Sequence, residues 1–241
     1  MWKIASTDHD GGRLEKAPAT RRLATWSVDS NDPIELHERT GSGGIRVVLG
    51  DHELAELVPV GDDTWGSADE LYARSDSLHC VFGQGQGTYA LKVVWRMVSE
   101  SSHRVILEPT ISIQTSLLDS CPVVDLCLTG NPDAREPNDD SSSELANRVH
   151  ATTWNANSSS TALLTVGDAS TTKEIRSGMD SDGLKTPVGV RLRLFGEFLE
   201  KGVIRKARPW LVFDRDGRTL SPSDQQKLAK QLDETPLPLT A

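Results

Sequence analysis

The stretch VGVRLRLFGEFLEKGVIRKARPWLVFD, residues 188–214, carries the longest regular pattern in the chain. Apolar side chains occupy every second position from Val188 to Leu194, and arginines stand between them. A period of two places alternate side chains on opposite faces of a β-strand. The alternation then stops, and the segment bracketed by Gly196 and Gly202 is typical of a hairpin connection or a short helical turn. An extended pattern returns in the second half of the stretch, so we expect two strands here.

The same alternation recurs along most of the chain. Further strands are predicted at 34–39, 45–49, 53–58, 89–98, 105–118, 123–128, 149–154 and 161–166. Pro109 and Pro209 lack the N–H that a central strand donates, so each predicts a sheet edge or a bulge. Many short strands separated by turn residues are typical of two packed sheets. We therefore predict a mainly β protein, an antiparallel two-sheet β-sandwich with one C-terminal helix.

The domain organisation follows from the length and the pattern. A chain of 241 residues suggests one large domain or two small ones, and a β-sandwich of this size can be a single domain. Residues 1–32 are polar and irregular, which predicts an N-terminal arm with one strand near 23–28. The rest, 33–241, is predicted to form a single β-sandwich domain that ends in the helix.

That helix is predicted at 222–233 from its start signals. Ser221 is a suitable N-cap, Pro222 fits the first helical position, and Asp224 lies in the first turn. Leu228 and Leu232 are four residues apart and form a narrow apolar stripe. We expect the helix to pack on the sandwich through these two leucines.

Charge and hydropathy exclude several classes of partner. The chain has 26 lysines and arginines against 35 aspartates and glutamates, a net charge of −9. An acidic chain of this kind is unlike nucleic-acid binders, which present a basic face, and unlike proteins that bind anionic membranes. No segment approaches the roughly 18 apolar residues of a membrane helix. The start of the chain lacks the apolar region of a secretory signal, so we expect a cytoplasmic protein.

The three cysteines, at 80, 121 and 127, predict free thiols. An odd, low count is typical of a reducing compartment. On one strand Cys121 and Cys127 would lie about 20 Å apart, beyond disulfide reach. No cysteine or histidine spacing matches a zinc site, so no metal is predicted. The glycine run 83–87 lacks the third glycine and the helix of a dinucleotide fingerprint, and no cofactor is predicted.

The candidate ligand site lies in the opening stretch. Glu197 and Glu200 fall in the connection, and Arg205, Arg208 and Trp210 follow in the second strand. An indole can stack on the C–H face of a sugar ring while charged groups bond its hydroxyls. Paired carboxylates can also divide general acid and base roles, which makes Glu197 and Glu200 the catalytic candidates. The alternative is a surface network of ion pairs that contributes little.

Two other acidic features have simpler explanations. The segment 131–144 carries five acidic residues and one arginine, and clustered carboxylates can hold Ca²⁺. Its ligand spacing is not specific, so we interpret it as a solvated loop. The D-x-D-G sequences at 180–183 and 214–217 lack the remaining EF-hand ligands and are interpreted as turns.

Two segments carry a family resemblance: ISIQTSLLDSCP at 111–122 and LFGEFLEKGVIRKAR at 194–208. They are similar to segments in a family of uncharacterised bacterial proteins, a resemblance that implies no assigned activity. The β pattern also resembles, at the level of the fold, the aldose 1-epimerase type of sandwich (galactose mutarotase-like), in which a glutamate base and a histidine acid interconvert anomers. The histidine motifs of that family have no counterpart here, so the analogy transfers no residues.

Three functions are consistent with these features. The first is a binding protein for carbohydrate. The second is a sugar-active enzyme of epimerase or lyase type that uses Glu197 or Glu200. The third is an interaction module that joins a protein partner through a sheet edge.

Overall fold

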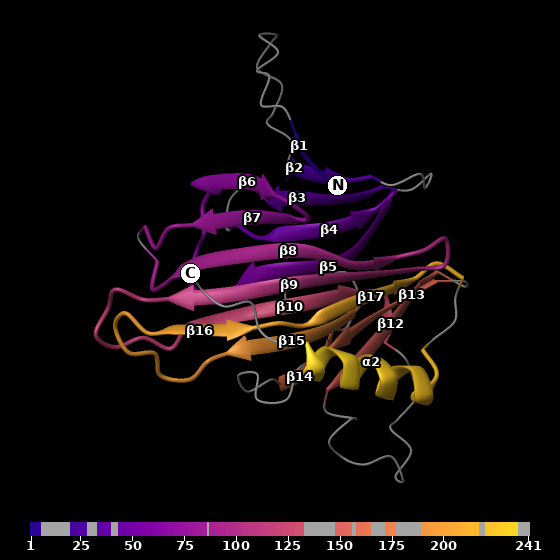
Figure 1. The fold of residues 1–241 in the computed structure, drawn as a ribbon. Coiled ribbons are helices and arrows are strands. Elements are labelled where there is room, and N and C mark those ends of the chain that lie inside the picture. Colours follow the sequence, from indigo (N-terminus) through magenta and orange to yellow (C-terminus); the bar gives the residue numbers. More distant parts are fainter. Residues whose placement is uncertain are drawn as a thin grey trace.

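The computed structural model describes residues 1–5, 20–27, 33–39, 43–85, 87–132, 148–155, 158–164, 172–176, 189–216 and 220–235. Most of the described residues lie in strands, and the two antiparallel sheets face each other without closing into a barrel. Figure 1 shows the two layers, with helix α2 lying against one of them. This confirms the predicted two-sheet β-sandwich with a C-terminal helix.

Sheet A has eight strands and is antiparallel throughout. In spatial order they are β1 (Trp2–Ile4), β2 (Thr20–Trp26), β3 (Ile34–Arg39), β4 (Ile45–Leu49), β5 (His52–Pro59), β10 (Val123–Thr129), β15 (Gly189–Phe195) and β14 (Thr172–Arg176). The predicted hairpin of 45–49 and 53–58 is present as β4 and β5, joined at a turn that uses a positive φ of 56° at Gly50.

Sheet B has nine strands, of which eight follow one another in order and one short strand pairs beside them. They are β11 (Asn131–Pro132), β12 (Val149–Asn155), β13 (Ser158–Leu163), β17 (Trp210–Asp214), β9 (Arg104–Gln114), β8 (Ala90–Glu100), β7 (Ser77–Phe82) and β6 (Glu70–Arg74), with β16 (Ile204–Ala207) beside β9. The longest strands, β8 and β9, form its centre.

The core fills the space between the two sheets. Burial alternates along β4, where Ile45, Val47 and Leu49 are buried and the residues between them are partly exposed. Facing strands of sheet B contribute side chains such as Trp95 and Phe213, which are almost completely buried. The burial that the period-two pattern predicts is therefore present: one face of each sheet forms the core, and the other faces outward.

The stretch 188–214 does not form a hairpin. Its first half is β15, which pairs with β10 and β14 in sheet A, and its second half is β16 and β17 in sheet B. The connection turns away from sheet A at Phe195 and Gly196, which have φ of 65° and 93°. The same alternation fits a hairpin and a crossover between sheets, because both bury one face of each strand.

Both prolines lie at one interruption in sheet B. On one side of β9 the pairing runs with β17 up to Leu107 and resumes with β16 at Ile111. Pro109 lies within that gap on β9, and Pro209 lies between β16 and β17. The predicted break at Pro209 is confirmed, but β9 is an interior strand, so Pro109 does not mark a sheet edge.

The N-terminal segment contributes to sheet A. Strand β1 pairs with β2, and β2 pairs with β3 through a register shift between Arg22 and Ala24. The buried indole of Trp2 lies edge-on against Trp26, with ring centroids 5.4 Å apart. Within 1–32, where we expect an irregular arm with one strand, the described residues therefore form two strands.

Helix α2 (Pro222–Glu234) begins as predicted. The Ser221 side chain accepts a hydrogen bond from the Asp224 backbone N–H at 3.2 Å. Leu232 is fully buried, and Leu228 is half-buried against the same small cluster on the outer side of sheet B. Within the described ranges, no helix is long and apolar enough to span a membrane.

The cysteines are all described, and no disulfide joins any of them. Cys80 lies inside the core, and its burial, together with the negative charge of Glu38, raises the pKa of its thiol to about 12. Cys127 is also buried, whereas Cys121 is exposed. The prediction of three thiols without a disulfide is confirmed.

Thiol reactivity should follow this burial. In the native protein at neutral pH, a disulfide reagent such as DTNB should titrate Cys121 quickly and leave Cys80 unmodified, because the buried group stays protonated and inaccessible. Denatured, unreduced protein should show all three thiols. A Cys121→Ser variant provides the control, and rapid labelling that persists in this variant would contradict the assignment.

Candidate functional site

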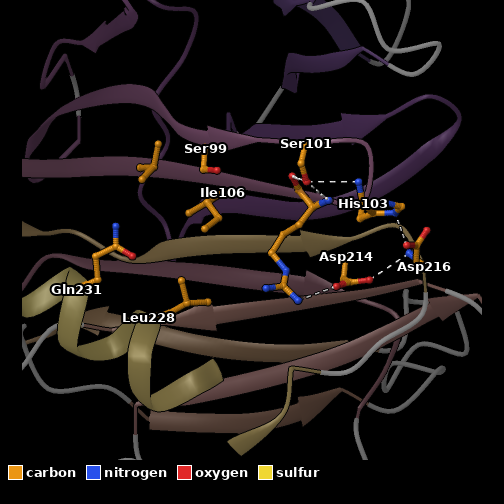
Figure 2. Close-up of a pocket in the computed structure, with 10 residues that line it drawn as sticks. Ser99, Ser101, His103, Ile106, Asp214, Asp216, Leu228 and Gln231 are labelled. Atoms are coloured by element: carbon orange, nitrogen blue, oxygen red, sulfur yellow. Dashed lines mark hydrogen bonds and ion pairs between the residues drawn. The ribbon is translucent and has the colours of Figure 1, made fainter. Parts of the chain in front are cut away.

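A pocket of about 540 Å³ opens between helix α2 and the end of sheet B where β8 turns into β9 (Figure 2). Three segments far apart in the sequence form its walls: the β8–β9 turn, the end of β17, and α2. Its lining residues are Val98, Ser99, Ser101, His103, Arg104, Ile106, Asp214, Asp216, Leu228 and Gln231. The volume is in the range of small-molecule sites, which is roughly 300–1,000 Å³.

The β8–β9 turn is fixed by one serine. The Ser101 backbone N–H donates to the Arg104 carbonyl at 2.8 Å, and the Arg104 N–H donates back to the Ser101 hydroxyl oxygen at 3.0 Å. The next strand over holds the turn from the side, since the Arg215 N–H donates to the His103 carbonyl at 2.8 Å. These backbone bonds position the residues that form one wall of the pocket.

The polar wall centres on Asp214. Its side chain is only 5% exposed, and it accepts a hydrogen bond from Arg104 Nη2 at 3.0 Å. The same carboxylate accepts from the Asp216 backbone N–H at 3.0 Å, which curls the chain at the end of β17. Arg104 and Asp214 are direct cross-strand partners in the β9–β17 pairing. An aspartate held in this way is a fixed acceptor beside the pocket.

The rim is more open. His103 Nδ1 contacts Asp216 Oδ2, and both side chains are well exposed. Figure 2 shows this pair beside Asp214, with Ser101 above them. Gln231 reaches the pocket from α2. Carboxylates, an amide, hydroxyls and an imidazole therefore surround the opening.

The floor is apolar. Val98, Ile106 and Leu228 line it, and Ile106 and Leu228 belong to the cluster that attaches α2 to sheet B. Figure 2 places Ile106 and Leu228 on opposite sides of the space between the helix and the strands. A ligand with one apolar side and several hydroxyls on its edge matches this division into floor and rim.

A metal site finds no support in the part of the chain that the structure describes, where no group of three histidine, cysteine, aspartate or glutamate side chains is placed to hold an ion. Most of the acidic segment 131–144, and the whole of 180–183, lie outside the described residues.

The structure separates the residues of the candidate site in 194–210. Glu197 forms a surface ion pair with Arg205, and Glu200 is exposed nearby. Arg208 and Trp210 are instead almost completely buried beneath α2. Their placement leaves no indole face open to a ligand beside the two glutamates. The assignment of Glu197, Glu200 and Arg205 to a ligand site stays a prediction.

Arg208 and Trp210 belong to a buried polar network. The Trp210 indole N–H donates to Glu108 Oε2 at 2.7 Å, and Arg96 lies 2.9 Å from the other oxygen. Arg208 Nη2 donates to the Leu232 carbonyl at 2.7 Å, near the end of α2. This network joins β8, β9 and β17 to the helix that forms one wall of the pocket.

The pocket residues carry only a weak signal in the sequence. Asp214 and Asp216 lie in a D-x-D-G segment, which predicts a turn. In the structure the chain bends at this point, where the Asp216 N–H donates to the Asp214 side chain. The signal that could have identified them is an aspartate pair directly after a strand of apolar residues. Their partners, His103 and Arg104, are more than 100 residues away, and no local pattern connects the two segments.

No protein-family model matches this chain, and no curated protein sequence does. Among solved structures, a crystal structure of a heparan sulfate lyase HepC mutant from Pedobacter heparinus is similar, with a TM-score of 0.49 and 7% sequence identity. The similar region covers 81% of this chain and 35% of that chain, so this chain spans about a third of that protein.

Proposed function

We propose that this protein binds carbohydrate in the pocket between α2 and the β8–β9 turn. The observation that carries the proposal is the combination of a fixed, buried carboxylate, Asp214, with an apolar floor in one pocket. A pyranose ring has the same two kinds of surface. Its C–H groups are apolar, and its hydroxyls need donors and acceptors at the edge.

The individual groups fit this role. Asp216 and Gln231 can accept hydrogen bonds from hydroxyls at the rim, and Gln231 can also donate one. Asp214 is held by Arg104, so its orientation does not have to be ordered when a ligand binds. The floor residues Ile106 and Leu228 offer the apolar contact.

The test is binding of a panel of neutral mono- and disaccharides, measured by thermal shift and then by calorimetry. Gln231→Ala should weaken the binding of any active sugar about five- to tenfold, and Asp216→Ala about tenfold or more, because each removes a hydrogen bond at the rim. Both side chains are exposed enough that stability should change by less than about 1 kcal/mol.

Gln226→Ala is the matched control, since Gln226 is an exposed glutamine on the same helix that does not line the pocket. It should bind sugar as the wild type does. The proposal fails if no sugar of the panel stabilises the protein, or if both pocket variants respond as the control does. The enzymatic and sheet-edge functions stay predictions that no contact in this pocket favours.

A further inference from the structure

Exposed apolar side chains gather at the end of the sandwich that lies away from the pocket. Of the eight large apolar side chains that are exposed in the described part of the chain, five come from two neighbouring segments. One segment is the β9–β10 loop, and the other is 196–204, which leads from β15 into β16. The five residues form what we call the apolar patch, and they are 40–82% exposed: Leu117, Leu118, Phe198, Val203 and Ile204.

Hydrogen bonds hold the two segments of the patch together. The Leu199 N–H donates to the Ser120 carbonyl at 2.8 Å, and the Gly202 N–H donates to the Thr115 carbonyl at 3.0 Å. Leu199 is fully buried in the main core, although its neighbour Phe198 is 49% exposed. The fold therefore fixes both segments while it leaves the side chains of the patch facing solvent.

The length of β9 separates the patch from the pocket. This strand begins at Arg104, which lines the pocket, and ends at Gln114, which pairs with Ile204 of the patch. A strand of 11 residues is roughly 35 Å long. Figure 1 shows the β9–β10 loop and the segment before β16 side by side at the left, with α2 on the right. A partner that covers the patch therefore leaves the pocket open.

The patch has the size that a protein–protein interface needs. Contiguous exposed apolar surface of a few hundred Å² is typical of interaction sites. A standard interface takes about 800 Å² from each partner, and about 60% of that area is apolar. Five large side chains that are 40–82% exposed supply an apolar area of this order. Covering them would remove the free-energy cost of keeping that surface in water.

The rim of the patch carries equal numbers of acidic and basic side chains. They are Asp119, Glu197, Glu200, Lys201, Arg205 and Lys206. Glu197 and Arg205 pair with each other, whereas the other four form no ion pair with a described residue. Two acids and two bases are therefore available to a partner, and they add no net charge.

This charge balance favours a second copy of the chain as the partner. The whole chain has a net charge of −9, so two copies repel each other except where a face carries as many bases as acids. Glu200 and Lys201 are neighbours of opposite charge. Two such neighbours related by a two-fold axis are complementary, because each copy presents the same surface to the other. An anionic lipid surface or a nucleic acid requires an excess of positive charge, which this rim lacks.

We propose that the protein forms a two-fold symmetric dimer through the apolar patch. The patch of one copy packs on the patch of the other, and at the rim Lys201 of each copy pairs with Glu200 of the other. The contact lies at the far end of β9 from the pocket, so each dimer carries two open pockets. The proposal does not depend on what the pocket binds.

The first test is sedimentation velocity of the full chain over a range of concentrations. Wild-type protein should pass from monomer to dimer with a dissociation constant of roughly micromolar size. Leu118→Asp and Ile204→Asp should each raise that constant at least about tenfold, because each places a charge inside an apolar contact. Both side chains are exposed, so both variants should fold, which circular dichroism checks. Ile4→Asp is the matched control: Ile4 is 42% exposed on β1, outside the patch, and its variant should dimerise normally.

A charge exchange tests whether the partner is a second copy. Glu200→Lys and Lys201→Glu should each weaken the dimer severalfold, because like charges then meet at the rim, and the double variant should restore it. A double variant that stays weak would overturn the symmetric contact.

Three other results would overturn the proposal. They are wild-type protein that stays monomeric, wild-type dimerisation of folded Leu118→Asp and Ile204→Asp, and a monomer that sediments with phosphatidylcholine vesicles through Leu118, which would assign the patch to lipid. Gln231→Ala should leave the dimer unchanged, which separates this surface from the pocket.

Discussion

Leu232→Ala should lower the free energy of unfolding by about 2–5 kcal/mol, because it removes a fully buried side chain and leaves a cavity. Leu232 lies among apolar residues of three different strands and of the segment before the helix: Leu163, Ile106, Trp210, Val212 and Leu220. Most of these neighbours lie on paired strands of sheet B, and the pairing limits how far they can move to fill the space. Urea unfolding followed by circular dichroism gives the measurement.

Two further variants, Leu228→Ala and Lys227→Ala, provide the comparison for this loss of stability. Leu228 is only half-buried against the same cluster, so Leu228→Ala should cost less than Leu232→Ala. Lys227 is exposed on the same helix, and Lys227→Ala should change stability by no more than about 0.5 kcal/mol. An unchanged unfolding midpoint for Leu232→Ala would mean that the helix does not contribute to the stability of the sandwich.

The helix shows what a sequence can establish by local chemistry. Ser221, Pro222 and Asp224 are within one turn of each other, and the cap they form depends on no distant residue. The leucine spacing likewise predicts which side of the helix is buried. The strands are equally local, since each strand shows its own alternation.

Strand pairing was not predictable in the same way. The pattern of 188–194 fits any arrangement in which one strand face packs on an apolar layer. It therefore does not predict that β15 pairs with β10, or that β17 pairs with β9 and β13. A hairpin is the simplest expectation for two strands joined by a short connection. The crossover is decided instead by contacts of the connection with distant residues, such as the Leu199 N–H donating to the Ser120 carbonyl at 2.8 Å.

The candidate site depends even more on distant residues. Alternation puts Arg208 and Trp210 on the same strand face, and in the structure both reach toward Glu108. Whether that face is open or covered depends on where α2 packs, which no pattern within 188–214 contains. The pocket likewise combines residues near 100, 214 and 230. The sequence shows each of these segments, but it does not predict that they lie close together in the fold.

Glu108→Ala should lower the free energy of unfolding by about 3–5 kcal/mol, as much as Leu232→Ala or more. The cause here is electrostatic, because the change leaves buried polar groups without their carboxylate. Glu108 is 2% exposed and lies on the central strand of sheet B. The alanine variant removes the oxygen that accepts the Trp210 indole hydrogen bond at 2.7 Å. It also removes the carboxylate that pairs with Arg96 at 2.9 Å. The buried guanidinium of Arg208, whose Nε lies 3.9 Å from Glu108, loses its nearby negative charge.

Glu108→Gln separates the charge from the hydrogen bond. Its amide oxygen can still accept from Trp210, so this variant should lose less stability than alanine, and the difference between the two measures the neutral hydrogen bond and the packing. Lys230→Ala, which removes an exposed pair with Glu234 at 3.7 Å, is the matched surface control and should change stability by less than about 0.5 kcal/mol. Urea unfolding followed by tryptophan fluorescence checks all three.

Because Arg208 also donates to the Leu232 carbonyl, Glu108→Ala should loosen the end of α2 as well, and hydrogen exchange of the last helical turn should quicken. A Glu108→Ala variant within about 1 kcal/mol of wild type, with unchanged exchange in α2, would show that the network is not needed to hold the helix on the sheet.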